Sequence, residues 1–442
     1  MEIINGFSKF NKAEKIEWLV NQLAKKSDSS FEESDLNRYW HSNKKEQKIF
    51  DEFSENTISN FYFPYGLAPN FSINNKIYTL PLVIEESSVV AAACKSAKFW
   101  LDRGGFKAKV ISTTKKGQVH FIWKGEREKL FNFFSVIKSH LLFNVKDLTT
   151  NMEKRGGGLK DIVLLDQTGN LENYYQLDVS FETCDAMGAN FINSVLEGLG
   201  EAITKFALGH DEFSDAEKEI EVIMCILSNY TPDCLVKAYV ECEVSELGIF
   251  PGEMSASEFA TRFERAVTIA KIDVNRAVTH NKGIFNGVDA VILATGNDFR
   301  AVEACGHAYA ARDGKYRGLS SCFVDKGIFR FELTLPLALG TVGGLTKLHP
   351  LAKASLEILD NPDAQELMKI VVCAGLAQNF GAITSLVTTG IQKGHMKMHL
   401  LNILNQLNAT EKQVVLAKDY FKDNIVSFSS VRAFLEGTNI LH

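Results

Sequence analysis

Apolar positions along the chain follow two spacings, one typical of helices and one typical of strands. Segments with apolar side chains every three or four residues are predicted to be helices. These segments are 12–26, 87–105, 127–143, 185–206, 255–273, 349–359 and 363–387. Short segments that alternate between apolar and polar residues are predicted to be strands. These are 78–86, 107–113, 117–123, 161–166, 174–183, 219–227 and 236–244.

Two local signals refine this pattern. Residues 314–340 read as a β-hairpin that turns at Asp325-Lys326-Gly327. Ser87 or Ser88 is the predicted N-cap of the helix over 87–105.

The order of the elements between residues 106 and 229 sets that segment apart. It reads β-β-α-β-β-α-β, with 107–113 and 117–123 predicted to be joined by a Lys-Lys-Gly turn. Such a run implies a small sheet with helices on one face, a ferredoxin-like insert. The predicted fold class is therefore α+β with a discontinuous large domain. The boundaries are 1–111 and 230–390 for the large domain, 112–229 for the small domain and 391–442 for a helical C-terminal flap.

Composition narrows the class of protein. The 442 residues, the net charge of −6 and the charged fraction of 23% predict two or three globular domains without a bias towards nucleic acid. We see no apolar run of the roughly 18 residues needed to cross a bilayer and no signal-peptide core. Eight cysteines without a C-x-x-C pair are typical of reduced thiols. We therefore expect a cytoplasmic protein with no membrane or nucleic-acid partner.

The stretch from Thr279 to Ala310 carries the strongest candidate chemistry. It places Lys282 in a predicted Gly/Asn-rich turn and Asp298 in a Thr-Gly-Asn-Asp turn, with the apolar helical segment 288–294 between them. A lysine and an aspartate that meet in a partly dry cleft perturb each other's titration, as catalytic groups require. Taken alone, the stretch also fits two surface turns that flank a buried helix.

This stretch resembles class II 3-hydroxy-3-methylglutaryl-CoA (HMG-CoA) reductases, which carry Thr-His-Asn-Lys-Gly followed by Thr-Gly-Asn-Asp at the same spacing. Four further matches occur in the same order, and the resemblance covers nearly the whole chain. They are VIEESSVVAAA (Val83–Ala93), DAMGAN (Asp185–Asn190), GTVGG (Gly340–Gly344) and GLAQNFGA with QKGHM (Gly375–Met396). The resemblance implies reduction of HMG-CoA to mevalonate and CoA by two reduced nicotinamide cofactors, for isoprenoid biosynthesis. It also implies a homodimer with active sites at the interface.

The resemblance implies catalytic roles for Glu86, Lys282, Asp298 and His395. Lys282 is expected to hold the oxyanion that forms when hydride attacks the thioester. His395, on a C-terminal flap, is expected to protonate the CoA thiolate, and Glu86 the final alkoxide. Asp298 is expected to hydrogen-bond Glu86 and Lys282 and to tune both. From the residues alone, Glu86 also fits a carboxylate that only stabilises the start of a helix.

Five further residues match substrate-binding positions of the family. By this resemblance, Ser88 is expected to contact the substrate and Arg276 to bind its carboxylate, a task that suits a bidentate guanidinium. Asn286 is expected to support Lys282 and Glu86. Gln378 and Ala382 match CoA contacts. Taken alone, Arg276 also fits an ordinary surface arginine.

The predicted dinucleotide site is not a Rossmann site, because we find no strand–GxGxxG–helix unit. Instead, DAMGAN opens a helix whose free N–H groups can hold a pyrophosphate. The resemblance implies cofactor contacts by Asp185, Met187, Gly188, Asn190 and Asn229. The local sequence alone leaves Asp185 equally suited to a plain N-cap.

Position 149 bears on the choice of cofactor. The NAD-preferring branch of the family has an aspartate seven residues before the triple glycine, and this chain has Thr149 there. Without that carboxylate a 2′-phosphate is not repelled, and Lys146, Lys154 and Arg155 lie close enough in sequence to pair with it. We therefore expect NADPH, with NADH as the alternative.

Two other functions fit parts of the sequence. One is an oxidoreductase that acts on another acyl-CoA or an aldehyde, although Arg276 and Ser88 favour a substrate with a distal carboxylate. The other is an inactive relative that only binds CoA. His395 and His399 have the spacing of a helical zinc pair, but the motif lacks its glutamate and a third ligand, so no metal is predicted.

Overall fold

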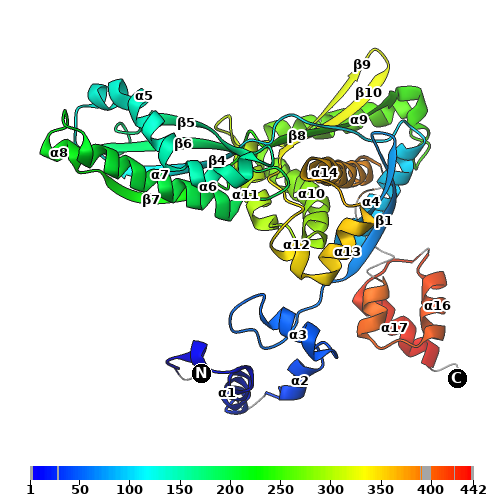
Figure 1. The fold of residues 1–442 in the computed structure, drawn as a ribbon. Coiled ribbons are helices and arrows are strands. Elements are labelled where there is room, and N and C mark those ends of the chain that lie inside the picture. The colour runs from blue at the N-terminus through cyan, green and yellow to red at the C-terminus, as the bar shows by residue number, and fades with distance from the viewer. Residues whose placement is uncertain (1–2, 27–28, 389, 391–399, 423, 440–442) are drawn as a thin grey trace.

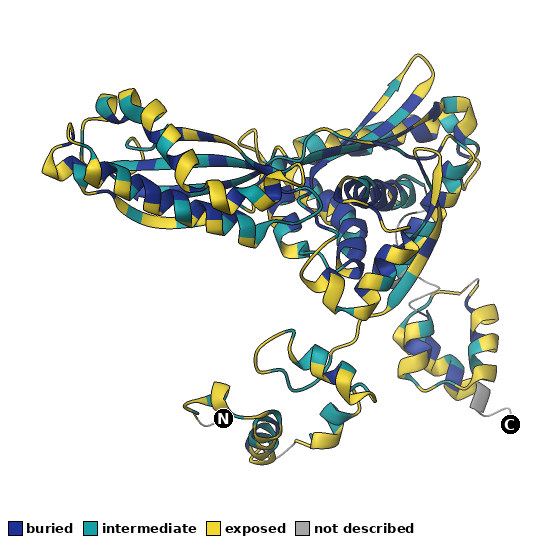
Figure 2. Ribbon diagram, viewed as in Figure 1, coloured by how far each residue is buried: buried dark blue, intermediate teal, exposed yellow. Residues whose placement is uncertain are grey.

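The computed structural model describes residues 3–26, 29–388, 390, 400–422 and 424–439, which form a mixed α+β fold around three apolar cores (Figures 1 and 2). The largest core joins residues 68–108 to residues 234–383, and we call this part the central body. The second core, over residues 119–220, belongs to a part that we call the lateral unit. The third core, over residues 400–435, belongs to the C-terminal helical unit.

Two antiparallel sheets frame the central body. The first pairs β1 (Tyr65–Ile73) with β2 (Lys76–Val83). The second has the order β3 (Lys107–Val110), β8 (Leu235–Glu243), β10 (Ile328–Pro336), β9 (Ser320–Asp325). The predicted hairpin is confirmed, because β9 and β10 pair across a turn in which Lys326 and Gly327 both have positive φ.

Helix α14 (Ala364–Val387) runs through the middle of the central body (Figures 1 and 2). It is apolar on all sides, and it packs against three helices and both central strands of the second sheet. Those helices are α4 (Ser87–Leu101), α9 (Ala256–Ile272) and α10 (Val274–Ala294). Within the described residues α14 alone has the length and apolarity of a membrane span, but 67% of that span is buried inside the protein, as in a core helix.

Shorter helices complete the central body. They are η2 (Val244–Leu247), α11 (Phe299–Ala310), α12 (Leu345–Leu348) and α13 (Pro350–Ile358).

The lateral unit is one antiparallel sheet with the strand order β5-β6-β4-β7. Its strands alternate buried and half-exposed positions, because long helices cover only one face. In chain order the elements are β4 (Lys115–Ile122), α5 (Arg127–Asn144), α6 (Lys146–Glu153), β5 (Gly158–Asp166), β6 (Tyr174–Glu182), α7 (Ala189–Gly209), α8 (Asp215–Lys218) and β7 (Glu221–Leu227).

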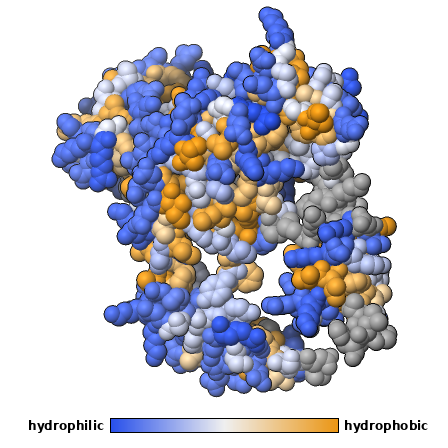
Figure 3. All heavy atoms as spheres, turned by 90° about the vertical axis from the view of Figure 1, so that its right-hand side faces the viewer, coloured by the Kyte–Doolittle hydropathy of each residue, from blue (hydrophilic) through white to orange (hydrophobic). Residues whose placement is uncertain are grey.

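Both ends of the chain form small helical segments below the central body in Figure 1. The N-terminal elements are η1 (Phe7–Lys9), α1 (Lys12–Ala24), α2 (Glu33–Asn37) and α3 (Lys44–Asp51). The C-terminal helical unit contains a helix over 400–406, α16 (Glu411–Tyr420) and α17 (Phe428–Asn439). Viewed from the side that carries β1, apolar surface gathers on the central body (Figure 3).

Three local predictions were wrong. Lys282 lies inside α10 rather than in a turn, because the Gly/Asn-rich residues around it continue the helix. Lys115-Lys116-Gly117 belongs to β4, and the preceding strand β3 pairs with β8 in the central body instead of with β4. Helix α4 begins at Ser87, so its N-cap is Glu86 and neither Ser87 nor Ser88.

Candidate active site

A cleft between α4, α10 and α14 holds the first group of predicted site residues, and we call it the first cleft. Its volume is about 1260 Å³. Lys282, near the middle of α10, places its Nζ 3.6 Å from Oε2 of Glu86, the N-cap residue of α4. The two side chains are 65% and 41% exposed, so a ligand in the cleft can reach both charges.

Ser88 holds the carboxylate of Glu86 from a second side. Its hydroxyl donates a hydrogen bond to Oε1 of Glu86, while Lys282 faces Oε2. The Glu86 side chain makes no capping hydrogen bond to α4. The alternative that Glu86 only caps its helix is therefore not the arrangement observed, because the carboxylate is shared between a hydroxyl and an ammonium in the cleft.

The remaining predicted substrate residues line the same cleft. Arg276 and Asn286 flank Lys282 on α10, and Gln378 and Ala382 are one turn apart on α14. Burial lowers the pKa of Arg276, and within the described ranges its guanidinium has no carboxylate partner. The Oε1 atom of Gln378 is buried and also lacks a hydrogen-bond partner there. Both groups are thus available to a bound molecule.

His280 lines the first cleft as well, and no signal in the sequence separates it from an ordinary core histidine. Asn379 Nδ2 donates to the His280 carbonyl oxygen at 3.4 Å, so its Oδ1 faces Ser320 and accepts that hydroxyl proton at 2.7 Å. Ser320 Oγ must therefore accept from His280 Nε2–H, at 2.6 Å.

The second ring nitrogen of His280 is left as a bare acceptor. Burial, with smaller contributions from Arg276 and Lys271, lowers the pKa of His280 to about 3, so the ring is neutral. Its Nδ1 then carries a lone pair, is buried, and has no hydrogen-bond partner in the part of the chain that the structure describes. His280 thus places a fixed, neutral acceptor beside a cleft that is also lined by Glu86, Arg276 and Lys282.

A second cleft, of about 1540 Å³, lies where the lateral unit meets the central body. Its walls include Met187, Gly188 and Asn190 at the start of α7, together with Asp298. Gly188 is the N-cap of α7 with a φ of 90°, and no side chain caps the first turn. The free N–H groups of that turn therefore border the second cleft.

Asp298 is engaged by its own helix. As N-cap of α11 it accepts from the backbone N–H groups of Arg300 and Ala301, at 3.0 and 3.2 Å. The Arg300 guanidinium donates to both carboxylate oxygens, at 3.2 and 3.4 Å. The expected bonds from Asp298 to Glu86 and Lys282 are not formed within one chain.

The separation of the two groups follows from the length of α10. Lys282 precedes Ala294, the last residue of that helix, by twelve positions. At 1.5 Å per residue these positions are about 18 Å apart along the axis. The middle of α10 therefore lines the first cleft, and the loop after its end, which carries Asp298, lines the second.

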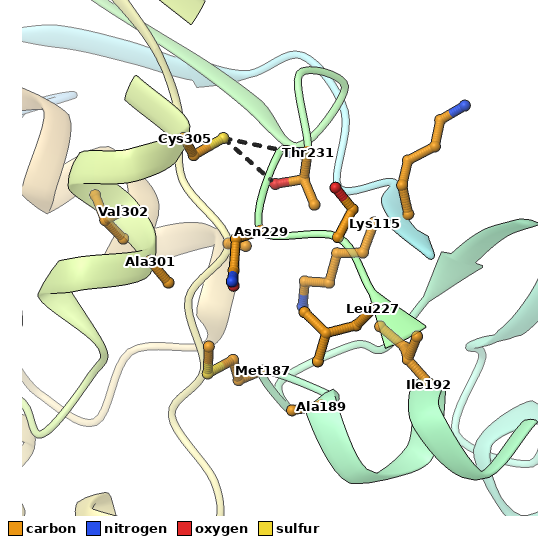
Figure 4. A pocket seen from close by; sticks show the side chains of 13 residues that line it. Lys115, Met187, Ala189, Ile192, Leu227, Asn229, Thr231, Ala301, Val302 and Cys305 are labelled. Atoms are coloured by element: carbon orange, nitrogen blue, oxygen red, sulfur yellow. Dashed lines mark hydrogen bonds between the residues drawn. The ribbon is translucent and has the colours of Figure 1, made fainter. Parts of the chain in front are cut away.

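Three predicted cofactor residues lie elsewhere. The Asp185 carboxylate accepts from Ala364 N at 2.9 Å, where it helps to cap α14. Thr149 is 3% exposed and donates to the Lys146 carbonyl oxygen. Asn229 lines a smaller cavity beside the second cleft, together with Met187 (Figure 4). His395 lies outside the described residues.

Comparison with known proteins decides the family. A sequence model described as hydroxymethylglutaryl-coenzyme A reductase matches residues 14–400. The chain belongs to this family. Its activity is that of an HMG-CoA reductase, an oxidoreductase.

Individual relatives agree with this assignment. The chain is 36% identical to a 3-hydroxy-3-methylglutaryl-coenzyme A reductase of Archaeoglobus fulgidus, over 83% of this chain and 80% of that one. It is 33% identical to a probable reductase of the same name from Borreliella burgdorferi, over 90% and 86%.

Solved structures place the chain beside class II enzymes. The class II 3-hydroxy-3-methylglutaryl-CoA reductase of Streptococcus pneumoniae, bound to NADPH in open conformations, superposes with a TM-score of 0.70 at 35% identity, covering 87% of this chain and 99% of that one. A second structure of the Streptococcus pneumoniae enzyme gives a TM-score of 0.71 at 34% identity, covering 98% and 99%.

Proposed function

We propose that the first cleft binds HMG-CoA and that the chain reduces its thioester to mevalonate and CoA with two molecules of NADPH, within isoprenoid biosynthesis. The observation that carries this assignment of the site is the Lys282–Glu86 pair, 3.6 Å apart, in one cleft with Arg276 and Ser88. An ammonium and a carboxyl group face the reacting carbonyl there, and a guanidinium is available for the distal carboxylate.

The side chains of the cleft divide the chemistry between them. Lys282 stabilises the oxyanion that develops when the thioester accepts hydride, and one such donor is typically worth about 3 kcal/mol or more. Glu86 supplies the proton that the final alkoxide needs, and Ser88 orients its carboxyl group. Asn286 lies one turn beyond Lys282 on the same helix. Gln378 and Ala382 provide the wall for CoA.

His395 completes this proposal as the donor of a proton to the CoA thiolate. An imidazolium with an ordinary pKa of about 6.5 is a stronger acid than a thiol of about 8.5, so the transfer is favourable. The C-terminal helical unit, which follows residue 395, is the proposed flap that brings it to the site.

The second cleft fits an anionic dinucleotide. The first turn of α7 offers N–H groups that no side chain caps, and Gly343 and Gly344 leave open space on the facing wall. The group bound there supplies the hydride. In this proposal the dinucleotide is held by Met187, Gly188 and Asn190, and Asn229 lies in the adjoining cavity. Asp185 and Thr149 do not line the cleft, and they contribute by stabilising the structure around it.

NADPH is favoured over NADH by two observations. Lys146, Lys154 and Arg155 are exposed around α6, next to Met152 in the wall of the second cleft, and Thr149 adds no negative charge. The Streptococcus pneumoniae relative was solved with NADPH bound.

We further propose that a complete active site forms between two copies of the chain, in a homodimer. Glu86 and Lys282 of one copy would meet Asp298 of the other, which a single chain cannot achieve because the two clefts are separate. The segment before β1 and the start of β1 provide apolar surface for such a contact, since Phe61 and Phe63 are 88% and 47% exposed and Leu67 in β1 is 48% exposed.

The domain limits given above are proposed on the same basis. The separate core of the lateral unit supports a small domain over 112–229 inserted into a large domain. Its β-α-β-β-α-β succession and the strand order β5-β6-β4-β7 support a ferredoxin-like fold for this domain. We propose that the dimer works in the cytoplasm.

The direct test is HMG-CoA-dependent oxidation of NADPH, followed at the nicotinamide absorbance. Lys282→Met and Glu86→Gln should each lower kcat by a factor of about 100 or more while CoA still binds. Acetyl-CoA in place of HMG-CoA should give no turnover, because Arg276 would have no carboxylate to bind. Oxidation with acetyl-CoA but not HMG-CoA would replace this proposal with the other acyl-CoA reductase function.

A further inference from the structure

Lys115, the first residue of β4, is a buried lysine that the proposed mechanism does not use. The residue is 4% exposed. Its ammonium donates to the carbonyl oxygen of Ala186 at 2.8 Å and to the hydroxyl of Thr183. Both acceptors belong to residues 183–188, the loop that leads into α7, and we call this segment the cofactor loop.

The charge of Lys115 has no carboxylate partner within ion-pair distance among the described residues. Glu182, Asp185 and the thiols of Cys184 and Cys234 are the titratable groups that face it. Glu182 accepts from Thr113 and from Cys184 N, and Asp185 accepts from Ala364 N. A buried cation without a paired anion is unusual, because burial removes its hydration.

The cofactor loop is held from the opposite side by the central body. Thr341 N donates to the Asp185 carbonyl oxygen at 2.9 Å. A Cβ on Gly340 would come within 2.5 Å of Met187 N, so the two backbones touch. Lys115 on one side and the turn over Gly340–Gly344 on the other therefore both contact the cofactor loop, directly before the first turn of α7.

Figure 4 shows the space around the lysine stem. Lys115, Met187 and Leu227 form one side of a cavity of about 430 Å³, open mouth included, and α11 forms the other through Val302 and Cys305. A longer side chain at position 115 has room to enter this cavity.

We propose that Lys115 is a positioning residue for the dinucleotide: it fixes the cofactor loop so that the α7 N–H groups face the pyrophosphate, and its unpaired charge favours the bound anion. This inference rests on the proposed function of the second cleft. Because the pyrophosphate is common to NADPH and NADH, Lys115 affects the affinity for both and leaves their ratio unchanged.

Substitution by methionine separates binding from folding. Thr183 Oγ1 donates to the Ala186 carbonyl oxygen at 2.6 Å, so these groups keep each other as partners when the ammonium is removed. Lys115→Met should therefore leave Tm equal or higher. The dissociation constants of NADPH and NADH should both rise about tenfold or more, because bonds from a charged donor are lost. A lysine with a merely structural role would lower Tm instead.

Two variants and one second ligand control the experiment. Lys116→Met removes the neighbouring lysine, which pairs with Asp178 at 2.7 Å on the sheet, and should leave NADPH binding unchanged. Lys115→Arg keeps the charge and should bind NADPH within about threefold of wild type. The dissociation constant of HMG-CoA in the first cleft should be the same for wild type and for the three variants Lys115→Met, Lys116→Met and Lys115→Arg.

The pH dependence of NADPH binding provides a test on the wild-type chain itself. Burial lowers the pKa of Lys115 from its ordinary value, whereas burial raises the pKa of Cys234 to about 12, so the lysine loses its proton before this thiol does. NADPH affinity measured by protein fluorescence should fall as pH rises towards the ordinary lysine pKa of about 10.4, with its midpoint below that value because burial lowers the pKa of Lys115, and the fall should be absent in Lys115→Met.

The outcomes are distinguishable. Failure of wild-type protein to bind NADPH would overturn the proposed function and this inference together. Wild-type binding that is equally tight in Lys115→Met, or that shows the same pH dependence in both proteins, would overturn this inference alone.

Discussion

Lys282 and His280 are two residues apart, yet the fold gives them opposite surroundings. Lys282 is 65% exposed in the first cleft, where its charge can act on a substrate. His280 is 1% exposed and is held neutral by burial and by neighbouring cations. At the scale of the residue, the helix sets this difference, because each step along α10 rotates the side chain by about 100° and so turns the His280 ring towards Ser320.

The low pKa of His280 makes stability depend on pH. The folded pKa is about 3 against an ordinary value of about 6.5, so the folded state binds fewer protons between these values. Its contribution is fully present above about pH 6.5 and is lost progressively as pH falls towards about 3. From pH 7 to 5, wild type should lose about 2 kcal/mol more of its free energy of unfolding than His280→Gln, which does not titrate.

Urea unfolding at both pH values measures this difference. The variant keeps an N–H donor for Ser320, so the local structure is preserved. The other titrating groups are the same in both proteins, so their contributions cancel in the difference between the two pH-dependent losses of stability. Parallel losses of stability in wild type and variant would contradict the neutral, buried state of His280.

At the scale of the element, two glycines of α10 have different surroundings, and one of them sets how closely α10 approaches α14. A Cβ at Gly287 would come within 2.5 Å of the Ala374 carbonyl oxygen of α14, whereas a Cβ at Gly283 would meet no atom within 4 Å. Gly287 thus lets the two helices approach closely. The glycines that suggested a turn in the sequence are used for helix packing at one position and leave the cleft open at the other.

These two glycines form a matched pair for a stability test. Gly287→Ala should destabilise the chain by about 1–3 kcal/mol, because α10 and α14 must separate. Gly283→Ala should stabilise it by about 0.5–1 kcal/mol, because alanine is the better helix former and no neighbour is in the way. Thermal or denaturant unfolding of both variants measures the difference. Equal effects of the two substitutions would show that the helices do not touch at Gly287.

At the scale of the whole molecule, the two clefts are separated by the body of α10, and in the proposed dimer a cleft of one chain would combine with a cleft of the other. The proposed dimer makes a quantitative prediction for mixed subunits. Lys282→Met and Asp298→Asn should each be inactive, but a mixed dimer contains one site with both wild-type residues. Random exchange at equal amounts should therefore restore about a quarter of wild-type activity.

A second mixture provides the control for this experiment. Lys282→Met combined with Glu86→Gln should stay inactive, because both residues belong to the same cleft of the same chain and every site then has a defect. Restoration in this control, or none in the first mixture, would contradict a site shared between subunits. HMG-CoA-dependent NADPH oxidation after subunit exchange is the measurement.

The α+β class, most of the strands, long helices such as α4, α7 and α14, and four candidate residues of the first cleft could be predicted from the sequence, whereas most of α10 and all of α11 could not. Apolar spacing predicts the elements, because it is a local property. The resemblance to the family, carried by five motifs in order, indicates Glu86, Ser88, Arg276 and Lys282 as candidates. The sequence did not reveal His280 or Lys115, because burial distinguishes them from other histidines and lysines, and burial is a property of the folded chain.

Which of these candidates lie close together depends on the folded structure. It paired Glu86 with Lys282 across α4 and α10, turned Asp185 towards α14, and placed Asp298 in another cleft. It also pairs β3 with β8 in the central body, and not with β4 as the sequence predicted. Such contacts join residues far apart in sequence. They depend on how whole elements pack, and a local pattern of apolar and polar positions carries no information about that packing.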